Sequence, residues 1–505
     1  MSATIRFLGV AVILWALAPP DAAVWAQCTE KQKLTAGDAA AGDWFGKCVS
    51  MSGDVAVVGA QYEDGVGTNR GAAYVYGYDG TSWVQEQKLG ASDPADSDYF
   101  GWRVSVDGDV LIVGAPYDDD KGTDSGSAYV YRYNGTSWDE EKKLTASDGA
   151  PGDQYGYSLA VDGDLMLVGA PYDDDKGPDS GSVYVYTYMG PVLKWVLVQK
   201  LTGGDATGGE YFGYCVSLRG DVVVVGAPWD AWLYQGSVYV YRAQGGTWHE
   251  EQKLIPADPA YYDTFGYSVS TTGEVVLVGS PGDDDQGDAS GSAYVFVHGG
   301  DTWVQDQKLT ARDGRGSDLF GYSVSLDGDV MVVGAPGGDT RILDTGCAYV
   351  YYLCGTWVEA KKLGASDSAG ADSYGNSVSV SGDRAIVGAP FDDDAGGDSG
   401  SAYVHAARPE LELWIDPVTA TQGDTVTFTV CCGYPGDPVA LFLMMVNGVP
   451  YPRMILVWTF GPDHKLTLPA TIPAGLAGTG LTFQSFKLAA CGGVVGSNLA
   501  DLTIH

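Results

Sequence analysis

Carboxylates recur in one pattern along this chain of 505 residues. Four loops open with three aspartates: DDDKGTDSG at 118–126, DDDKGPDSG at 173–181, DDDQGDASG at 283–291 and DDDAGGDSG at 392–400. In an extended run of three residues, the first and third side chains point together and the middle one points away. Ca²⁺ accepts oxygen ligands in flexible geometry, so each loop could offer two carboxylates to one ion, helped by the later aspartate or a neighbouring segment. The predicted calcium ligands are Asp118, Asp120, Asp124, Asp173, Asp175, Asp179, Asp283, Asp285, Asp392, Asp394 and Asp398.

The same loops have a second interpretation that involves no metal. Aspartate and glycine dominate turns because Asx side chains bond to their own backbone and glycine adopts positive φ. The spacing also differs from that of an EF-hand, whose ligands alternate. Turn chemistry combined with solubilising charge therefore stands beside the calcium prediction.

One copy of the acidic loop is aromatic instead. It reads WDAWLYQG at 229–236 and places Trp229, Trp232 and Tyr234 where other copies carry acids. Exposed aromatic groups in a loop are typical of ligand contacts. These three residues are predicted to contact a sugar or a protein, and packing against another domain of the chain is the alternative.

Catalytic motifs are absent from the sequence. None of the five histidines, His249, His298, His405, His464 and His505, falls in a repeated position. The chain has no HExxH, GxSxG or Cys-His motif. Paired carboxylates can act as acid and base on sugars, so a lyase or dehydratase is an alternative function. The sequence favours a protein that is not an enzyme.

These loops belong to a repeat with fixed internal spacings. Seven aromatic-glycine pairs begin at Phe45, Phe100, Tyr155, Phe212, Phe265, Phe320 and Tyr374, and each is followed 14 residues later by the glycine of Gly-Ala-Pro or a variant. A leucine precedes each aromatic residue by 11 positions, and a tryptophan precedes six of these leucines by 6. The period is 53 to 57 residues, and its variation falls in two segments that we interpret as surface loops.

Each period contains four predicted strands. In the second copy, GWRVSV alternates and ends at Asp107-Gly108, a hairpin signal, and DVLIVGA is apolar throughout. After the acidic loop, SAYVYRY and WDEEKKL flank a turn at Asn134-Gly135. Four antiparallel strands per period of about 50 residues are typical of propeller blades, so seven copies predict an all-β, seven-bladed propeller over 27–407.

The ends of the repeat array predict a closed ring. The last copy lacks its tryptophan–leucine strand, whereas CTEKQKL at 28–34 supplies a spare one before the first copy. Closure by this N-terminal strand would remove two exposed sheet edges. In such a ring the loop between the second and third strands and the link between blades open on the same face.

That face is predicted to be strongly acidic. The links carry two acids five residues apart, in the pairs Asp38/Asp43, Asp93/Asp98, Asp148/Asp153, Asp205/Glu210, Asp258/Asp263, Asp313/Asp318 and Asp367/Asp372. The net charge of −37 argues against nucleic acid as a partner and favours cations or basic partners.

The regions outside the repeats indicate export and a second domain. Residues 1–26 resemble a signal peptide, with Arg6, the apolar run FLGVAVILWAL and a cleavage site after Ala26, so the mature protein is expected outside the cytoplasm and not inserted in a membrane. Residues 410–505 contain about seven short strands separated by turns, which predicts an immunoglobulin-like β-sandwich. Cys431 or Cys432 could pair with Cys491, while most other cysteines are predicted to be buried thiols.

The aromatic-glycine and Gly-Ala-Pro pairs resemble those of FG-GAP repeat proteins, which include the N-terminal propeller of integrin α-subunits. The resemblance covers about 34–407 and implies an extracellular role in adhesion or ligand binding. That family often carries a DxDxDG calcium loop between the two motifs, whereas this chain has a tight turn there, such as 106–109. The family's calcium ligands therefore have no counterpart here, and any calcium would use the opposite face.

The leading hypothesis is a secreted or cell-surface adhesion module, with a periplasmic location also open. Its acidic face would bind an extracellular protein or glycan, with Ca²⁺ as a possible cofactor. A purely structural matrix protein is the remaining alternative.

Overall fold

The structure is a computed structural model that describes residues 5–7, 30–65, 67–230, 234–338, 345–353, 355–408, 412–416, 425–431, 438–446, 449–459, 465–471, 480–488 and 494–503. It divides into two compact units, Thr29–Ala407 and a second unit of Met1–Cys28 with Arg408–His505. Within the described part of the chain, no helix is long and apolar enough to cross a membrane.

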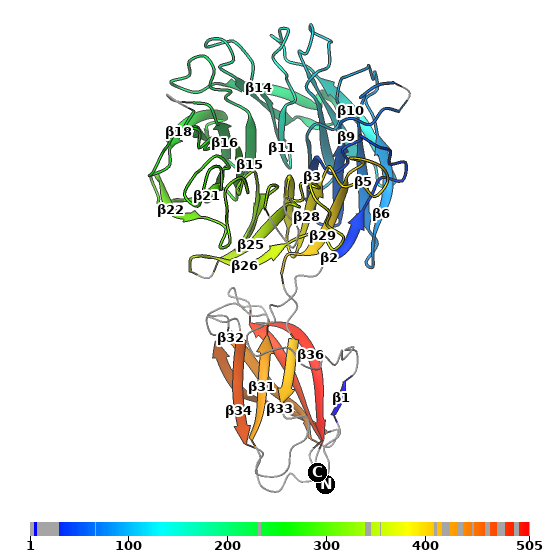
Figure 1. Cartoon of the computed structure of the whole chain (residues 1–505), viewed down its shortest axis with the longest axis vertical. Coiled ribbons are helices and arrows are strands. Elements are labelled where there is room, and N and C mark those ends of the chain that lie inside the picture. Colours follow the sequence, from blue (N-terminus) through cyan, green and yellow to red (C-terminus); the bar gives the residue numbers. More distant parts are fainter. Residues whose placement is uncertain are drawn as a thin grey trace. The chain divides into compact units, whose positions relative to one another are not determined.

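The first unit is a seven-bladed β-propeller, as the repeats predict (Figure 1). Each blade is a four-stranded antiparallel sheet, and in blades one to six the strands run outward in sequence order. Blades one to three comprise β3 (Cys48–Ser52), β4 (Val55–Ala60), β5 (Ala72–Tyr78) and β6 (Trp83–Leu89); β7 (Val104–Asp107), β8 (Val110–Ala115), β9 (Ser127–Tyr133) and β10 (Trp138–Leu144); and β11 (Ser158–Asp162), β12 (Leu165–Ala170), β13 (Ser182–Tyr188) and β14 (Trp195–Leu201). A one-turn helix, α1 (Gly190–Leu193), lies in the outer hairpin of blade three.

The remaining blades follow the same plan. Blades four to six comprise β15 (Cys215–Arg219), β16 (Val222–Ala227), β17 (Ser237–Gln244) and β18 (Thr247–Leu254); β19 (Ser268–Thr271), β20 (Val275–Ser280), β21 (Ser292–His298) and β22 (Trp303–Leu309); and β23 (Ser323–Asp327), β24 (Val330–Ala335), β25 (Cys347–Leu353) and β26 (Trp357–Leu363). Blade seven contains β27 (Ser377–Ser381), β28 (Arg384–Ala389), β29 (Ser401–Ala406) and, as its outermost strand, β2 (Glu30–Leu34).

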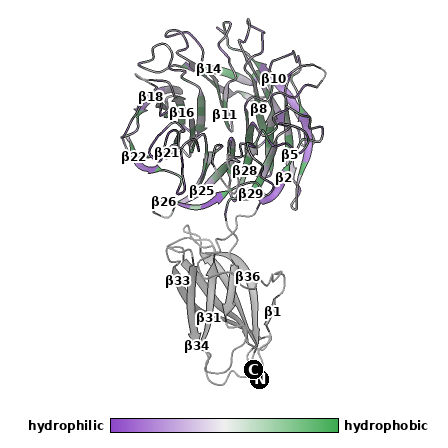
Figure 2. Ribbon diagram, viewed as in Figure 1, coloured by the Kyte–Doolittle hydropathy of each residue, from purple (hydrophilic) through white to green (hydrophobic). Residues whose placement is uncertain are grey.

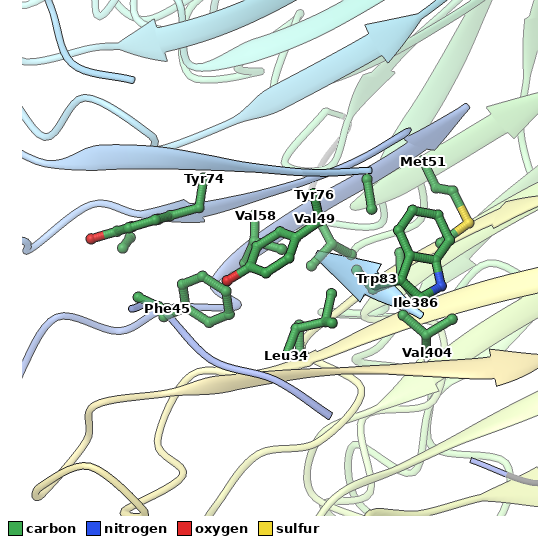
Figure 3. Close-up of a cluster of buried hydrophobic side chains, with 14 of the residues drawn as sticks. Leu34, Phe45, Val49, Met51, Val58, Tyr74, Tyr76, Trp83, Ile386 and Val404 are labelled. Carbon is green, nitrogen blue, oxygen red and sulfur yellow. The ribbon is translucent and has the colours of Figure 1, made fainter. Parts of the chain in front are cut away.

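The N-terminal strand closes the ring as predicted. β2 pairs antiparallel with β29, and Leu34 lies opposite Ala402. Its side chains also continue into the hydrophobic cluster that fills the space between blades seven and one, where Leu34, Ile386 and Val404 meet Trp83 (Figure 3). Closure therefore joins the two ends of the array by both a β-ladder and a shared core.

The core consists of layers between neighbouring blades. The second and third strands are apolar on both faces because each is covered by a blade on either side, whereas the outermost strands carry hydrophilic residues (Figure 2). Hydrogen bonds also join the outer strands of neighbouring blades. The Gln87 side chain of blade one accepts from the backbone N–H of Trp138 in blade two and donates to its carbonyl, each at 2.8 Å.

The glycine of each aromatic-glycine pair lies where backbone segments of two blades pack closely together. Gly101 has φ +92°, and a Cβ on it would lie 2.2 Å from the carbonyl oxygen of Ala72 in blade one. Its N–H donates to the carbonyl of Gly114 at 3.0 Å, which joins the two halves of the motif within one blade. The motif is thus a packing device, since only glycine allows this approach.

The second unit contains two antiparallel sheets. One has the order β1–β36–β35–β32–β33, and the other β30–β31–β34. Their strands are β1 (Ile5–Phe7), β30 (Glu412–Asp416), β31 (Thr425–Cys431), β32 (Pro438–Val446), β33 (Val449–Thr459), β34 (Lys465–Thr471), β35 (Gly480–Leu488) and β36 (Val494–Thr503). Cys432 and Cys491 lie outside the described residues, so the predicted disulfide stays a prediction. β1 falls within the predicted signal peptide, so a cleaved chain would lose this edge strand.

Candidate functional site

Each complete acidic loop surrounds a lysine of its own blade. In blade two the Lys143 ammonium lies 2.8 Å from Oδ2 of each of three aspartates, Asp93 of the incoming link and Asp118 and Asp120 of the loop. The Tyr129 hydroxyl oxygen lies 2.9 Å from an oxygen of both Asp93 and Asp118, and these two carboxylates share its single proton as acceptors. Asp118 is buried, and its charge is compensated by the ammonium and this phenol. We call this arrangement the lysine cluster.

The cluster recurs around the ring with conserved geometry. In blades three and five, Lys200 and Lys308 each bond to three aspartates at 2.6–2.9 Å. In blade seven, Lys33 of the N-terminal strand bonds to Asp367, Asp392 and Asp394, so the closing strand also completes a site. The first and third aspartates of each run thus converge, as their spacing predicts.

The carboxylates keep these lysines charged. Burial alone would lower the pKa of Lys143, but the hydrogen bonds that its ammonium donates to Asp118, Asp120 and Asp93 outweigh burial and raise the pKa above its usual value. In blade five, burial of Asp283 is likewise outweighed by Lys308 and Tyr294, and its pKa falls. The structure therefore supplies a permanent positive charge inside each of these loops.

The other predicted loop ligands have backbone roles. Oδ1 of the middle aspartate, Asp119, accepts from the N–H of Asp124 at 2.8 Å. Asp124 has φ +55°, and its carbonyl accepts from Gln154 of the next link at 3.1 Å. The same bond to the middle aspartate is made by Asp179 and Asp398, which also have positive φ. The structure places these three later aspartates in the turn, and none of them bonds to the cluster lysine.

The second acid of each link is buried beneath the face. Asp98, for example, is 4% exposed and accepts from the N–H of Ala95 at 2.7 Å. Burial raises the pKa of this carboxyl to about 6, an effect that its hydrogen bond only partly offsets. The corresponding acids with a pKa raised to about 6 are Asp153, Asp263 and Asp372.

Three blades have reduced clusters. Lys88 bonds to Asp38 and Glu63 in blade one, and Lys253 bonds to Asp205 and Asp230 in blade four. In blade six Gly338 stands where blade two has Asp118, and among the described residues Lys362 bonds to one carboxylate, Asp313, at 2.9 Å. The lysine and tyrosine are retained even where the acids are not.

The aromatic residues predicted in blade four have different environments. Trp229 is partly buried, and its ring centroid lies 5.0 Å from that of Tyr211 and 4.8 Å from that of Tyr214. Tyr234 is 44% exposed and lies 5.5 Å from Tyr262, which is 61% exposed. Trp232 lies outside the described residues. The exposed pair joins the loop of blade four to the link that follows it.

Trp229 belongs to a longer chain of rings that sequence reasoning missed. Successive ring centroids are 4.4–6.2 Å apart in the order Phe391, Trp44, Tyr62, Tyr99, Tyr117, Trp102, Tyr157, Tyr172, Tyr211, Trp229, Tyr214, Tyr267, Tyr322. We call this chain the aromatic band. Its residues flank the aromatic-glycine and Gly-Ala-Pro motifs, so they lie on the same face as the acidic loops.

Both missed features had a signal in the sequence. A Lys-Leu pair ends every fourth strand, at Lys33, Lys88, Lys143, Lys200, Lys253, Lys308 and Lys362. Aromatic residues recur directly after the motif glycine or proline, as at Trp102 and Tyr117. Repetition marked these positions, but only the fold shows what each residue faces.

The repeats match a known family. FG-GAP repeats are found at residues 28–76, 83–131, 138–186, 195–241, 248–296, 303–351 and 357–405. The chain belongs to the FG-GAP repeat family. Each matched FG-GAP segment begins on an outermost strand and ends on the third strand of the next blade, so the sequence repeat is offset from the blade.

Integrin α-chains are similar to part of this chain. Integrin alpha-7 of Mus musculus is 38% identical over 122 residues, which cover 22% of this chain and 10% of that protein. Integrin alpha-11 of Homo sapiens is 33% identical over 138 residues, or 23% of this chain and 11% of that protein. Integrin alpha-6 of Gallus gallus is 30% identical over 131 residues, or 23% and 12%. The match spans about a tenth of each relative.

Proposed function

We propose that this protein is a secreted or cell-surface binding module whose ligand face carries the aromatic band and the lysine clusters. The band is the observation that supports this most directly. Most of its rings are partly exposed. They begin at blade seven and continue through blades one to six around the inner part of one face. Exposed contiguous aromatic surface of this kind is typical of interaction sites.

The charge of this face favours a basic partner. A complete lysine cluster has three carboxylates and one ammonium, so it remains negative even with its lysine in place. Four such clusters surround the aromatic band. Complementary charge speeds association and excludes acidic partners. An extracellular protein with a basic, partly apolar surface fits best, and a glycan is the second candidate because Tyr234 and Tyr262 form an exposed aromatic pair.

Ligand arrays test this proposal. The mature protein would be screened against extracellular proteins and glycans, together with a Tyr234→Ala/Tyr262→Ala variant. Tyr133 is a matched control because it is 37% exposed but lies at the outer hairpin of blade two, on the opposite face. Hits should be lost in the double variant and retained in Tyr133→Ala. Equal binding by all three proteins would refute this location of the ligand site.

Calcium would have to share the acidic loops with the lysines. The donor set suits Ca²⁺ in kind, since oxygens of Asp367, Asp392 and Asp394 all lie within 4.8 Å of one another. Lys33 bonds to the same three carboxylates. We propose that Lys33 and its counterparts compete with calcium for these oxygens, so that a calcium-bound loop requires its lysine to move away.

Thermal unfolding in millimolar Ca²⁺, with Mg²⁺ as the control, tests this competition. A Lys33→Met variant should gain a calcium-specific rise in melting temperature that exceeds the rise in the wild type. An equal rise in both proteins would show that the lysine does not compete and would support the calcium site that the sequence predicts.

We infer a non-enzymatic role. The three described histidines have structural partners away from this face: His249 contacts Thr247, His298 packs on Trp303, and His405 contacts the Tyr374 hydroxyl. Burial lowers the pKa of His405 to about 3, so it is neutral at physiological pH. The carbohydrate-active enzyme and the matrix protein are alternatives that the arrays would distinguish by turnover of a glycan or by absence of any ligand.

A further inference from the structure

The propeller axis contains a cavity to which all seven blades contribute. Its volume is about 150 Å³, and its lining includes Arg103, Tyr267, Tyr322 and Asn376. A cavity of 10–15 Å³ already accommodates a water molecule, so this one has room for several waters or for a small ion. The innermost strands begin here, just below the aromatic band.

Two cations break the sevenfold symmetry around this cavity: Arg103 lines it, and Lys47 interacts with Tyr322 of its lining. The second residue after the motif glycine is serine or cysteine in six blades, and its side chain typically bonds to the next blade, as when Ser268 donates to the carbonyl of Gly321 at 2.8 Å. Blade two has Arg103 at this position. The preceding position is tyrosine in blades three to six, whereas blade one has Lys47.

Neither cation has a carboxylate partner among the residues that the structure describes. The groups that interact electrostatically with Arg103 are Cys48 and the tyrosines Tyr157, Tyr214 and Tyr267. The groups that interact electrostatically with Lys47 are Tyr322, Cys48 and Arg103. Both cations are partly exposed, and two like charges that lack a counter-charge and repel each other are costly.

The local potential is positive although the protein carries a net charge of −37. Burial lowers the pKa of Lys47, and repulsion by the positive charge of Arg103 lowers it further. Burial would raise the pKa of Tyr322, but the charge of Lys47, a hydrogen bond with Tyr267 and the charge of Arg103 lower it below the usual value. In the lysine clusters, burial and the neighbouring carboxylates raise the pKa of Tyr129 and Tyr184 instead.

We propose that the axial cavity binds a small oxyanion at Arg103, with Lys47 adding a second positive charge beside the cavity. The guanidinium offers a planar fork of donors that matches sulfate, phosphate or a carboxylate, and the ammonium adds a point charge. Tyr322 of blade six and Asn376 of blade seven supply further donors in the lining of the cavity. The cavity size selects a free anion, and the acidic loops around the face would repel an acidic macromolecule.

Calorimetric titration of the mature protein with sodium sulfate, phosphate and acetate tests the proposal, with sodium chloride holding the ionic strength constant. At least one oxyanion should bind with a stoichiometry of one. The three titrations distinguish a tetrahedral anion from a carboxylate. Arg103→Met and Lys47→Met should each raise Kd at least tenfold, and each variant should fold because it removes one of two like charges that repel each other.

Lys121→Met is the matched control, since Lys121 is an exposed lysine in the loop of blade two. It should leave Kd unchanged. The proposal is wrong if none of the three oxyanions binds saturably, if the Arg103→Met and Lys47→Met variants both bind as the wild type does, or if the Lys121→Met variant loses binding equally. If one of the Arg103 and Lys47 variants does not fold, the other still decides between these results.

Discussion

Removal of one cluster lysine tests whether these residues compensate the acidic face. In Lys143→Met, three carboxylates lose the ammonium that lies 2.8 Å from each of them. The side chain of Asp118 is 4% exposed, whereas those of Asp93 and Asp120 are 49% and 47% exposed. One carboxylate therefore stays buried without a compensating charge, with the Tyr129 hydroxyl and the N–H of Asp120 as its neutral donors, and the other two can be rehydrated.

The magnitude follows from this difference in exposure. Breaking a buried ion pair by removing one partner costs about 3–5 kcal/mol, and the lower end applies because only one acid is buried. A unit of roughly 380 residues unfolds with an entropy of about 0.8 kcal/mol/K. A loss of about 3 kcal/mol then lowers the melting temperature by about 4 °C.

Differential scanning calorimetry at pH 7.5 would measure this shift, and blade six provides the control. Lys362 has the same position as Lys143, but Gly338 replaces the buried aspartate and the bonded Asp313 is 58% exposed. Lys362→Met should cost at most about 1 kcal/mol. A second variant, Lys143→Met/Asp118→Asn, should recover most of the loss because it also removes the stranded charge.

Equal melting temperatures for the Lys143 and Lys362 variants would refute the reasoning. So would a failure of the Asp118→Asn change to restore stability. Either result would mean that the loops tolerate their carboxylates without the lysine, through hydration or a bound cation.

Three further changes should have distinct effects. Asp98→Asn should stabilise the protein above pH 6, because the wild-type carboxyl, whose pKa is about 6, is buried as an anion there. The gain in stability should shrink as the pH falls toward 4, where the Asp98 carboxyl of the wild type is protonated. Melting curves across pH would check this. Gly101→Ala should cost about 3 kcal/mol or more, since its Cβ would lie 2.2 Å from a carbonyl oxygen, whereas Gly108→Ala, with φ +55° and nothing within 4 Å, should cost about 1 kcal/mol in denaturant unfolding. Gln87→Ala should cost about 2 kcal/mol, because two backbone groups of Trp138 lose partners at 2.8 Å, and unchanged denaturation midpoints would contradict that role.

The blade and the ring are encoded in short-range patterns. Alternation in SAYVYRY, the hairpin at Asp107-Gly108 and the spare strand at 28–34 each follow from side-chain periodicity or turn chemistry over a few residues. Because strand order determines on which side each loop emerges, the acidic face was also predictable from the sequence.

The partners of those acids were decided by the tertiary structure alone. Lys143 is 50 residues from Asp93 and 25 from Asp118, and it reaches both because the fourth strand passes beneath the loop and link of its own blade. Arg103 occupies an ordinary repeat position in the sequence, and only closure of seven blades places it in a cavity together with Tyr267, Tyr322 and Asn376. Periodicity records which face of a strand a residue occupies, whereas the charges that meet across that face depend on how distant strands are packed.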